Sequence, residues 1–183
     1  MGTLFPKFFT PRSLGVVGPL LIAVLVFGQF IVPPQAQVAA YDVREVKLSK
    51  YLKSVNSPLA EHASTFVREA DKNALDYRLL PAIAGVESTF ARNYIITSHN
   101  AYGWGGGKIY FQSWEEGIAK ISNDLKTKYV DRGADTVEKI SWIYCPPGNL
   151  IWAAKVRYFM NKIEETEVEV KNDFLATALP LTL

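Results

Sequence analysis

Cysteine and histidine are scarce in this sequence, which contains one cysteine, Cys145, and two histidines, His62 and His99. An internal disulfide bond needs two cysteines and is therefore excluded. A zinc site of the usual kind, built from histidine and cysteine ligands, is not expected from so few of these residues. We expect no metal ion and no other cofactor, so the fold must be stabilised by its apolar core.

Acidic residues are missing from the first forty residues, where Lys7 and Arg12 precede an apolar run from Ser13 to Val32. Basic residues ahead of such a run keep the N-terminus in the cytoplasm and direct the following chain across the membrane. The run of about 20 residues can span a bilayer, and it exceeds the usual signal-peptide core of about 7–15 residues. A small-residue cleavage site nevertheless precedes Tyr41.

Residues 1–40 are therefore predicted to be either a signal peptide or an N-terminal hydrophobic helix that anchors the protein in the membrane. In both cases the remainder of the chain is exported. We expect it at the outer face of the cytoplasmic membrane, in the cell wall or outside the cell.

A surplus of positive charge is also missing from the exported part. The whole chain has 20 basic and 18 acidic residues, and leaving out Lys7 and Arg12 makes the two numbers equal. A nucleic-acid-binding domain is expected to carry a basic surplus. The composition therefore argues against nucleic acid as a partner.

Capping residues and apolar spacing predict a mainly α-helical single domain over residues 57–165. Residues 41–56 are a weakly patterned lead-in or short helix, and residues 166–183 form an acidic and then apolar tail. The glycine-rich residues 103–112 are predicted to form a loop with a small β-hairpin. The expected helix starts are Ser57 with Pro58, Asp76, Ser113 with Glu116, Asp135 with Glu138, and Asn149.

A glutamate stands out on the second of these helices. Leu80, Ile83, Ala84 and Glu87 share one stripe at 3.6 residues per turn, which predicts that Glu87 faces the core. Burial and the negative end of the helix dipole would both raise its pKa. A carboxyl group that stays protonated near neutral pH can act as a general acid. The alternative is a glutamate that turns to solvent or pairs with Arg92 or Lys108.

The stretch "NAYGWGGG", residues 100–107, offers a facing wall for a cleft. Its glycines permit close approach of the backbone, and Tyr102 and Trp104 could present flat rings to a sugar. So many glycines make a poor apolar core. On the last helix, by contrast, Trp152 is expected to belong to the core together with Val156, Phe159, Met160 and Ile163.

Three stretches resemble the lysozyme-like superfamily, in particular bacterial peptidoglycan glucosaminidases (mannosyl-glycoprotein endo-β-N-acetylglucosaminidase-like enzymes) and lytic transglycosylases. They are "DYRLLPAIAGVESTF", "HNAYGWGG" and "IYCPPGNLIWAAKVRYFMNKI", and the likeness extends over about residues 57–163. It implies a lysozyme-like α+β domain. The loop reads "GWGGGK" where soluble transglycosylases usually have Gly-Leu-Met-Gln, and "YCPPGN" replaces their Tyr-Asn-x-Gly, which favours the glucosaminidase side.

The resemblance implies a role for each matching residue. Glu87 would be the catalytic acid, and Tyr144 would face it across the cleft. Ser88 would contact or position the substrate, and Asn100, Ala101 and Gly103 would form the wall, beside the rings of Tyr102 and Trp104. The implied substrate is a β-1,4-linked N-acetylhexosamine glycan such as peptidoglycan.

A second catalytic carboxylate, as most glycosidases use, is not required by the sequence. Glu115 and Glu116 are explained by helix capping, and Asp124 lies on the same helix. The substrate could then supply the nucleophile, through its N-acetyl group or a muramic acid hydroxyl. Two other classes stay open: a non-catalytic glycan-binding module, and a membrane-anchored scaffold whose apolar tail binds a partner.

Overall fold

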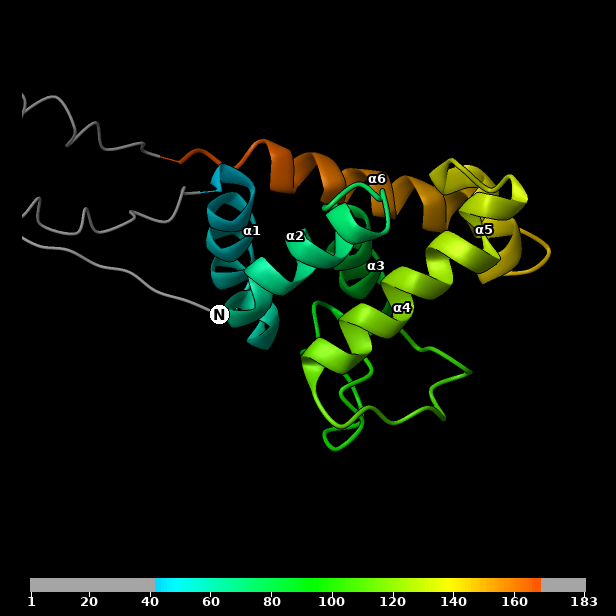
Figure 1. The fold of residues 1–183 in the computed structure, drawn as a ribbon, viewed down its shortest axis with the longest axis horizontal. Helices are drawn as coiled ribbons and strands as arrows, with labels where there is room; N and C mark the ends of the chain where they lie inside the picture. The colour runs from blue at the N-terminus through cyan, green and yellow to red at the C-terminus, as the bar shows by residue number, and fades with distance from the viewer. Residues whose placement is uncertain (1–41, 169–183) are drawn as a thin grey trace, which may run out of the picture. The chain divides into compact units, whose positions relative to one another are not determined.

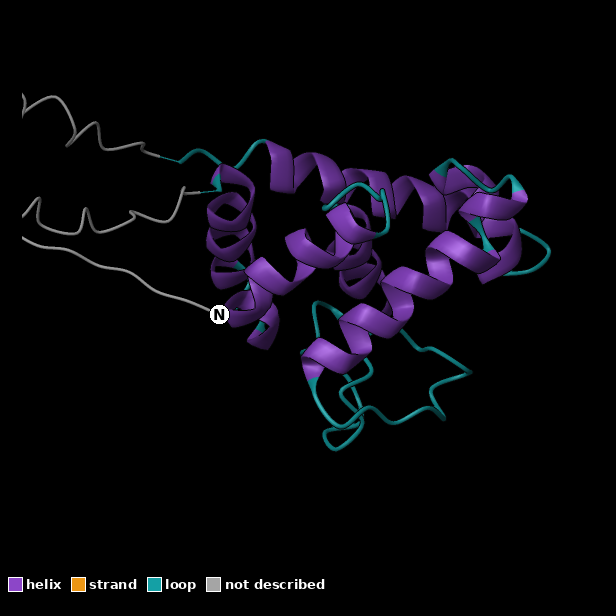
Figure 2. Cartoon of the chain, in the orientation of Figure 1, coloured by secondary structure: helices purple, strands orange, loops and turns teal. Residues whose placement is uncertain are grey.

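The computed structural model describes residues 42–168, and these form α-helices joined by turns and loops (Figures 1 and 2). The expected hydrophobic N-terminal helix and the end of the C-terminal tail lie outside this range. None of the helices within it is long and apolar enough to cross a membrane. In chain order the elements are α1 (Val43–Ser54), η1 (Pro58–His62), α2 (Ala63–Lys72), α3 (Leu79–Ser88), α4 (Trp114–Lys128), η2 (Val130–Arg132), α5 (Val137–Tyr144) and α6 (Leu150–Glu164), where η marks a 3₁₀ helix.

Three of the predicted N-caps are confirmed. The side chains of Ser57, Ser113 and Asn149 each accept a hydrogen bond from a backbone N–H in the first turn that follows. The turn after Ser57 is a 3₁₀ helix, so the α-helix itself starts later, at Ala63. The second half of the predicted capping box is shifted by one residue, because Glu116 accepts from the N–H of Gln112.

The predicted cap of α5 is wrong by one residue. Thr136, not Asp135, accepts the bond from the backbone N–H of Lys139. Asp135 instead forms an ion pair with the Lys139 side chain, and Glu138 forms one with Arg157 on α6. The Glu138–Arg157 pair joins residues 19 positions apart and could not be seen in the local pattern.

Helix α3 is the most enclosed helix of the domain. Its residues Leu79 to Gly85 are all buried, and it packs against α6. Gly85 makes the close approach possible, since a β-carbon there would lie 2.5 Å from the ring of Phe90 and 3.0 Å from that of Phe159. Helix α1, within the expected lead-in, belongs to the same core, because Leu48 and Leu52 are completely buried.

The chain leaves α3 through a left-handed turn. Thr89, Phe90 and Ala91 have φ angles of 54°, 58° and 58°, a conformation that costs L-residues energy. Several hydrogen bonds hold the turn: the Ser88 hydroxyl accepts from the N–H of Ala91 at 2.9 Å, and the Ser57 hydroxyl donates to the carbonyl of Phe90 at 2.9 Å. The end of α3 is therefore held by a hydrogen bond within the turn and by one from Ser57, a residue distant in the sequence.

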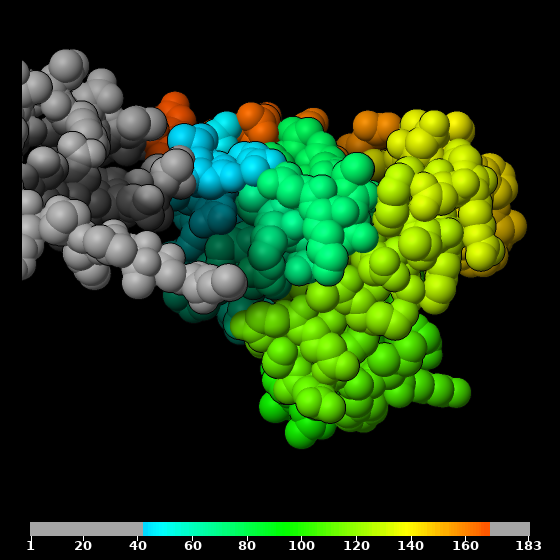
Figure 3. Space-filling view, viewed as in Figure 1, coloured from blue at the N-terminus to red at the C-terminus, as the bar shows by residue number. Residues whose placement is uncertain are grey.

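Residues 103–112, where a small hairpin was predicted, form turns and irregular chain without an assigned strand (Figure 2). The physical reason is the glycine backbone: Gly103, Gly105, Gly106 and Gly107 all have positive φ angles between 61° and 76°. Such angles curl the chain locally, as in the bond from the N–H of Gly107 to the carbonyl of Gly103. In the space-filling view the chain around residue 100, coloured green, protrudes below the helices (Figure 3).

Candidate active site

Glu87 lies in the last turn of α3, and as a whole residue it is exposed. The prediction that Glu87 faces the core is wrong, because the residue lies at the surface. Residues Leu79 to Gly85 of α3 are buried on all sides, so the stripe of Leu80, Ile83 and Ala84 does not define one inner face. The helix reaches the surface of the domain with its last turn, and Glu87 is placed at that edge.

The carboxyl group of Glu87 is nevertheless held in place. Its Oε1 accepts a hydrogen bond of 2.7 Å from the indole Nε1–H of Trp152. Its Oε2 faces Gly103 and lies 3.4 Å from the position that a β-carbon of that glycine would take. No ion pair joins Glu87 to Arg92 or Lys108 within residues 42–168, so that branch of the alternative is not found. The exposure of the residue agrees with the other branch, a glutamate that reaches solvent.

These surroundings shift the protonation equilibrium of Glu87. Desolvation of its carboxyl end raises the pKa above the ordinary glutamate value, and the hydrogen bond from Trp152 partly opposes this shift by stabilising the anion. The raised pKa agrees in direction with the sequence-based expectation, although the burial is only partial. A carboxyl group of this kind stays protonated to a higher pH than a free glutamate.

A small pocket opens beside the acid. It has a volume of about 160 Å³ and is lined by Gly103, Trp104, Gly105, Gly106, Tyr129 and Tyr144. The three rings pack against one another with centroid distances of 5.7 Å for Trp104–Tyr144, 6.0 Å for Trp104–Tyr129 and 6.4 Å for Tyr129–Tyr144. The structure thus brings Gly103, Trp104 and Tyr144 together near Glu87, as the sequence predicted.

Asn100 was expected to contact substrate, but its side chain is buried and already uses its polar atoms. Its Nδ2 donates to the carbonyls of Trp104 and Ile109 at 3.0 and 2.9 Å. Its Oδ1 accepts from the N–H groups of Tyr102 and Trp104 at 3.3 and 3.0 Å. Asn100 therefore stabilises the loop of residues 103–112, called the glycine loop below. Its hydrogen bonds take the place of the strand pairing that this loop lacks.

Three further candidates are corrected by their burial. Ala101 and Tyr102 have no exposed surface, so the Tyr102 ring cannot serve as a sugar platform. Ser88 is also buried, and its hydroxyl donates to the carbonyl of Ala84 at 3.0 Å. These side chains belong to the core and to the turn that follows α3, and they do not line the pocket.

Tyr144 reaches the site from the end of α5. Its hydroxyl donates to the carbonyl of Tyr102 at 2.5 Å, so the hydroxyl is directed to the loop backbone and not to Glu87. Its ring stacks on Trp152 with a centroid distance of 5.0 Å and an interplanar angle of 28°. Burial raises the pKa of Tyr144, and the nearby Glu87 carboxylate adds to this shift.

Two residues of the site were not identified from the sequence. Trp152 was correctly predicted to be buried in the last helix, but its bond to Glu87 joins residues 65 positions apart and leaves no local pattern. Tyr129 follows the last turn of α4 and was not considered. One signal was available for Trp152, since a buried indole N–H usually needs an acceptor.

The candidates for a second carboxylate have other partners. Glu115 pairs with His62 at 2.8 Å, and Glu116 accepts from the N–H of Gln112. Asp124 is buried and pairs with Lys120 and Lys128. Among the described residues, only burial and Trp152 shift the pKa of Glu87.

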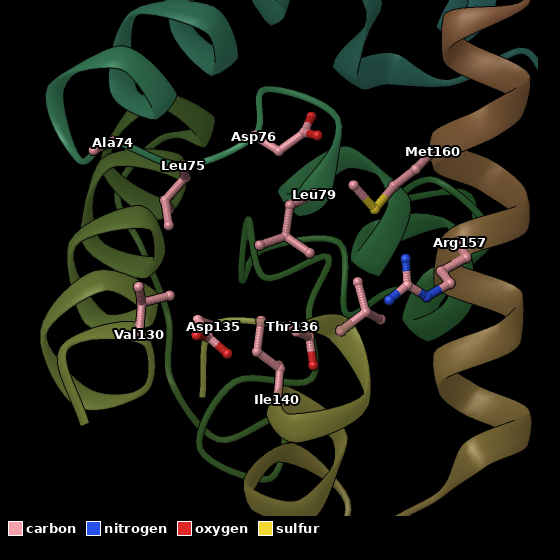
Figure 4. A pocket seen from close by; sticks show the side chains of 11 residues that line it. Ala74, Leu75, Asp76, Leu79, Val130, Asp135, Thr136, Ile140, Arg157 and Met160 are labelled. Atoms are coloured by element: carbon pink, nitrogen blue, oxygen red, sulfur yellow. The ribbon is translucent and has the colours of Figure 1, made fainter. Parts of the chain in front are cut away.

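A larger pocket, of about 330 Å³, lies elsewhere, among the start of α3, η2, α5 and α6. The apolar Leu79 lies between the charged Asp76, Asp135 and Arg157, and Ile140 lies below them (Figure 4). Each charged group already has an ion-pair partner: Arg78 for Asp76, Lys139 for Asp135 and Glu138 for Arg157. The pocket shares no residue with the one beside Glu87.

Comparison of the chain with protein-family models gives no match, and comparison with curated proteins gives none either.

Proposed function

We propose that the exported part of this protein cleaves cell-wall glycan, acting on β-1,4 bonds of peptidoglycan as an N-acetylglucosaminidase or a lytic transglycosylase. One observation carries the proposal. The carboxyl group of Glu87, with its raised pKa, is held by Trp152 and faces the glycine loop beside a pocket lined by aromatic rings. The described helices would then be those of a lysozyme-like domain.

Glu87 would act first as a general acid. In its protonated form it donates the proton to the glycosidic oxygen as the bond to the anomeric carbon breaks. Its carboxylate then takes a proton back, from the water that opens the ring formed by the N-acetyl group or from the attacking muramic acid hydroxyl. One residue can serve both steps if its pKa lies near the working pH, and the raised pKa favours this.

The nucleophile would come from the substrate. Since Glu115, Glu116 and Asp124 have other partners, the N-acetyl oxygen of the sugar can attack the anomeric carbon, and water then opens the resulting ring. In the transglycosylase route a muramic acid hydroxyl attacks instead and gives an anhydro product. Both routes are exceptions to the two-carboxylate pattern and need one protein acid only.

Sugar rings would bind next to the acid on flat surfaces. Trp104, Tyr129 and Tyr144 line the neighbouring pocket, and aromatic faces suit the apolar faces of pyranose rings. The glycine loop would form the opposite wall of the cleft. Residues 1–40 would bring the enzyme to the membrane, either as a cleaved signal peptide or as a retained anchor, so that it meets its substrate outside the cytoplasm.

The test is the substitution Glu87→Gln in the full-length protein. It keeps the size of the side chain and removes the acid, so we expect release of fragments from purified peptidoglycan to be abolished while the thermal midpoint changes little. Glu61→Gln, at an exposed glutamate on η1, is the matched control and should remain active. Clearing of a peptidoglycan gel by Glu87→Gln would overturn the proposal.

Mass analysis of the released muropeptides identifies the bond and distinguishes hydrolysed from anhydro products. It also tests the main alternative, a non-catalytic module that binds glycan through the same aromatic pocket. Wild-type protein that sediments with peptidoglycan but releases no fragments would support that binding module over the enzyme.

A further inference from the structure

We infer that Trp152 is the positioning residue of the Glu87 acid: its indole fixes Oε1 and leaves Oε2, which faces Gly103, as the oxygen that transfers the proton. The inference rests on the proposed function and adds a residue to it. It also assigns different tasks to the two oxygens of one carboxyl group.

The hydrogen bond itself distinguishes the two oxygens. Trp152 donates from Nε1 to Oε1 at 2.7 Å. An indole has a single N–H and cannot accept, so this bond has only one direction. Oε2 lies on the side of the glycine loop, 3.4 Å from the position of a hypothetical Gly103 β-carbon. A proton on Oε2 is therefore directed toward the proposed substrate cleft.

Trp152 is itself fixed, as a positioning residue must be. The residue is 6% exposed, and its ring stacks on Tyr144. Its backbone N–H is bound by the Asn149 side chain at 2.9 Å, in the first turn of α6. Tyr144 is tied in turn to the carbonyl of Tyr102, next to Gly103. Contacts through Trp152 and Tyr144 thus connect the Glu87 carboxyl group to the glycine loop that it faces.

The alternative is that Glu87 merely satisfies a buried indole N–H and gains no orientation from it. The two cases predict different consequences for Glu87 when Trp152 is replaced. If Trp152 positions Glu87, its loss must change the protonation and the turnover of the enzyme. If the bond is only structural, its loss must lower stability and leave the pH profile of the surviving activity unchanged.

The first experiment compares Trp152→Phe with Trp142→Phe, a matched change at an exposed tryptophan on α5. For Trp152→Phe we expect kcat on soluble glycan chains to fall about tenfold, with KM changed by less than about twofold. The basic limb of the pH–rate profile should move to higher pH, because the bond that stabilises the Glu87 anion is gone. Trp142→Phe should change neither quantity.

The second experiment does not depend on activity or on the folding of Trp152→Phe. The four tryptophans of the chain give four indole N–H signals in a ¹H–¹⁵N spectrum of the full-length protein in mild detergent. Single Phe substitutions of Trp104, Trp114 and Trp142 assign the signal of Trp152 by elimination. It should shift with pH as Glu87 titrates, at a higher pH than a free glutamate because burial raises the Glu87 pKa, and should not shift in Glu87→Gln.

The outcomes separate the inference from the proposed function. An active enzyme whose Trp152 signal does not titrate, or titrates equally in Glu87→Gln, overturns the inference. Unchanged kcat and pH profile in a folded Trp152→Phe overturn it as well. A wild-type protein that cleaves no glycan while its Trp152 signal titrates with Glu87 overturns the proposed function instead.

Discussion

The ring of Phe90 lies directly against the α-carbon of Gly85, where a β-carbon would come within 2.5 Å of it. Phe90 cannot easily move away, because its ring also packs edge-to-face against Tyr51 and Phe159, with centroid distances of 5.6 and 4.9 Å. This contact fixes the turn that follows Glu87 against the helix that carries it.

Gly85→Ala should therefore destabilise the domain, although alanine is normally the better helix former by roughly 0.5–1 kcal/mol. Overpacking of a core typically costs about 1–3 kcal/mol, and we expect a net loss in this range in urea unfolding. Asn123→Ala, on the exposed side of α4, is the control and should change stability little. Equal or higher stability of Gly85→Ala would mean that Phe90 can be displaced without cost.

A second prediction concerns Asn100 and the glycine loop. Asn100→Asp keeps the acceptor for Tyr102 and Trp104 but replaces the NH₂ donor by an oxygen that faces the carbonyls of Trp104 and Ile109. Two lost hydrogen bonds and a poorly solvated charge should cost about 2–4 kcal/mol in chemical denaturation. The exposed Asn93→Asp is the matched control.

The effect of Asn100→Asp should also depend on pH. Burial among carbonyls raises the pKa of the introduced carboxyl group above its unfolded value. The neutral acid is therefore favoured in the folded state, and the loss of stability grows as pH rises through the folded-state pKa. A deficit that is constant with pH would contradict the placement of this side chain between two carbonyls.

A third prediction concerns the ion pair between Glu138 on α5 and Arg157 on α6. The guanidinium lowers the Glu138 pKa from its ordinary value of 4.5 to about 2. The pair thus stabilises the folded state above about pH 4.5, and its contribution is lost as pH falls toward 2. Both side chains are about half exposed, so the contribution is at most about 1 kcal/mol.

Glu138→Gln should accordingly lower the free energy of unfolding by up to about 1 kcal/mol at neutral pH. The difference from wild type should shrink toward zero near pH 2, as thermal scans across this range can measure. The double variant with Arg157→Gln should lose little more than either single variant, since the same pair is removed. Full additivity of the two changes would show that the pair contributes nothing.

Local rules were sufficient to predict much of the helical framework. Ser113 and Asn149 cap their helices as expected, because an N-cap depends on residues within a few positions. The start expected at Asp76 is less exact, because α3 begins at Leu79 and Asp76 accepts a hydrogen bond from the N–H of Arg78, ahead of the helix. In the site, Glu87, Gly103, Trp104 and Tyr144 do lie together, which the likeness to a known cleft suggested and spacing alone did not require.

The remaining details depend on contacts between distant residues. Burial of Ser88, Asn100 and Tyr102 is set by packing against other elements, so polar or aromatic residues beside a candidate acid were wrongly expected to face substrate. The helical stripe placed Glu87 inward because the projection does not show where a helix reaches the surface. Trp152 was missed as a partner because it lies 65 positions from Glu87 in the sequence.

The glycine loop is held by the hydrogen bonds of the Asn100 side chain, and it has no paired strands whose register must be kept. At its tip, Gly106 and Gly107 have open space around them, with nothing within 4 Å of where a β-carbon would be. Lengthening such a loop costs little, about 0.6 kcal/mol for each doubling of its length. New residues grafted between these two glycines would therefore extend one wall of the proposed cleft while the helical core keeps its packing, which makes the loop the natural place to redesign which glycans fit.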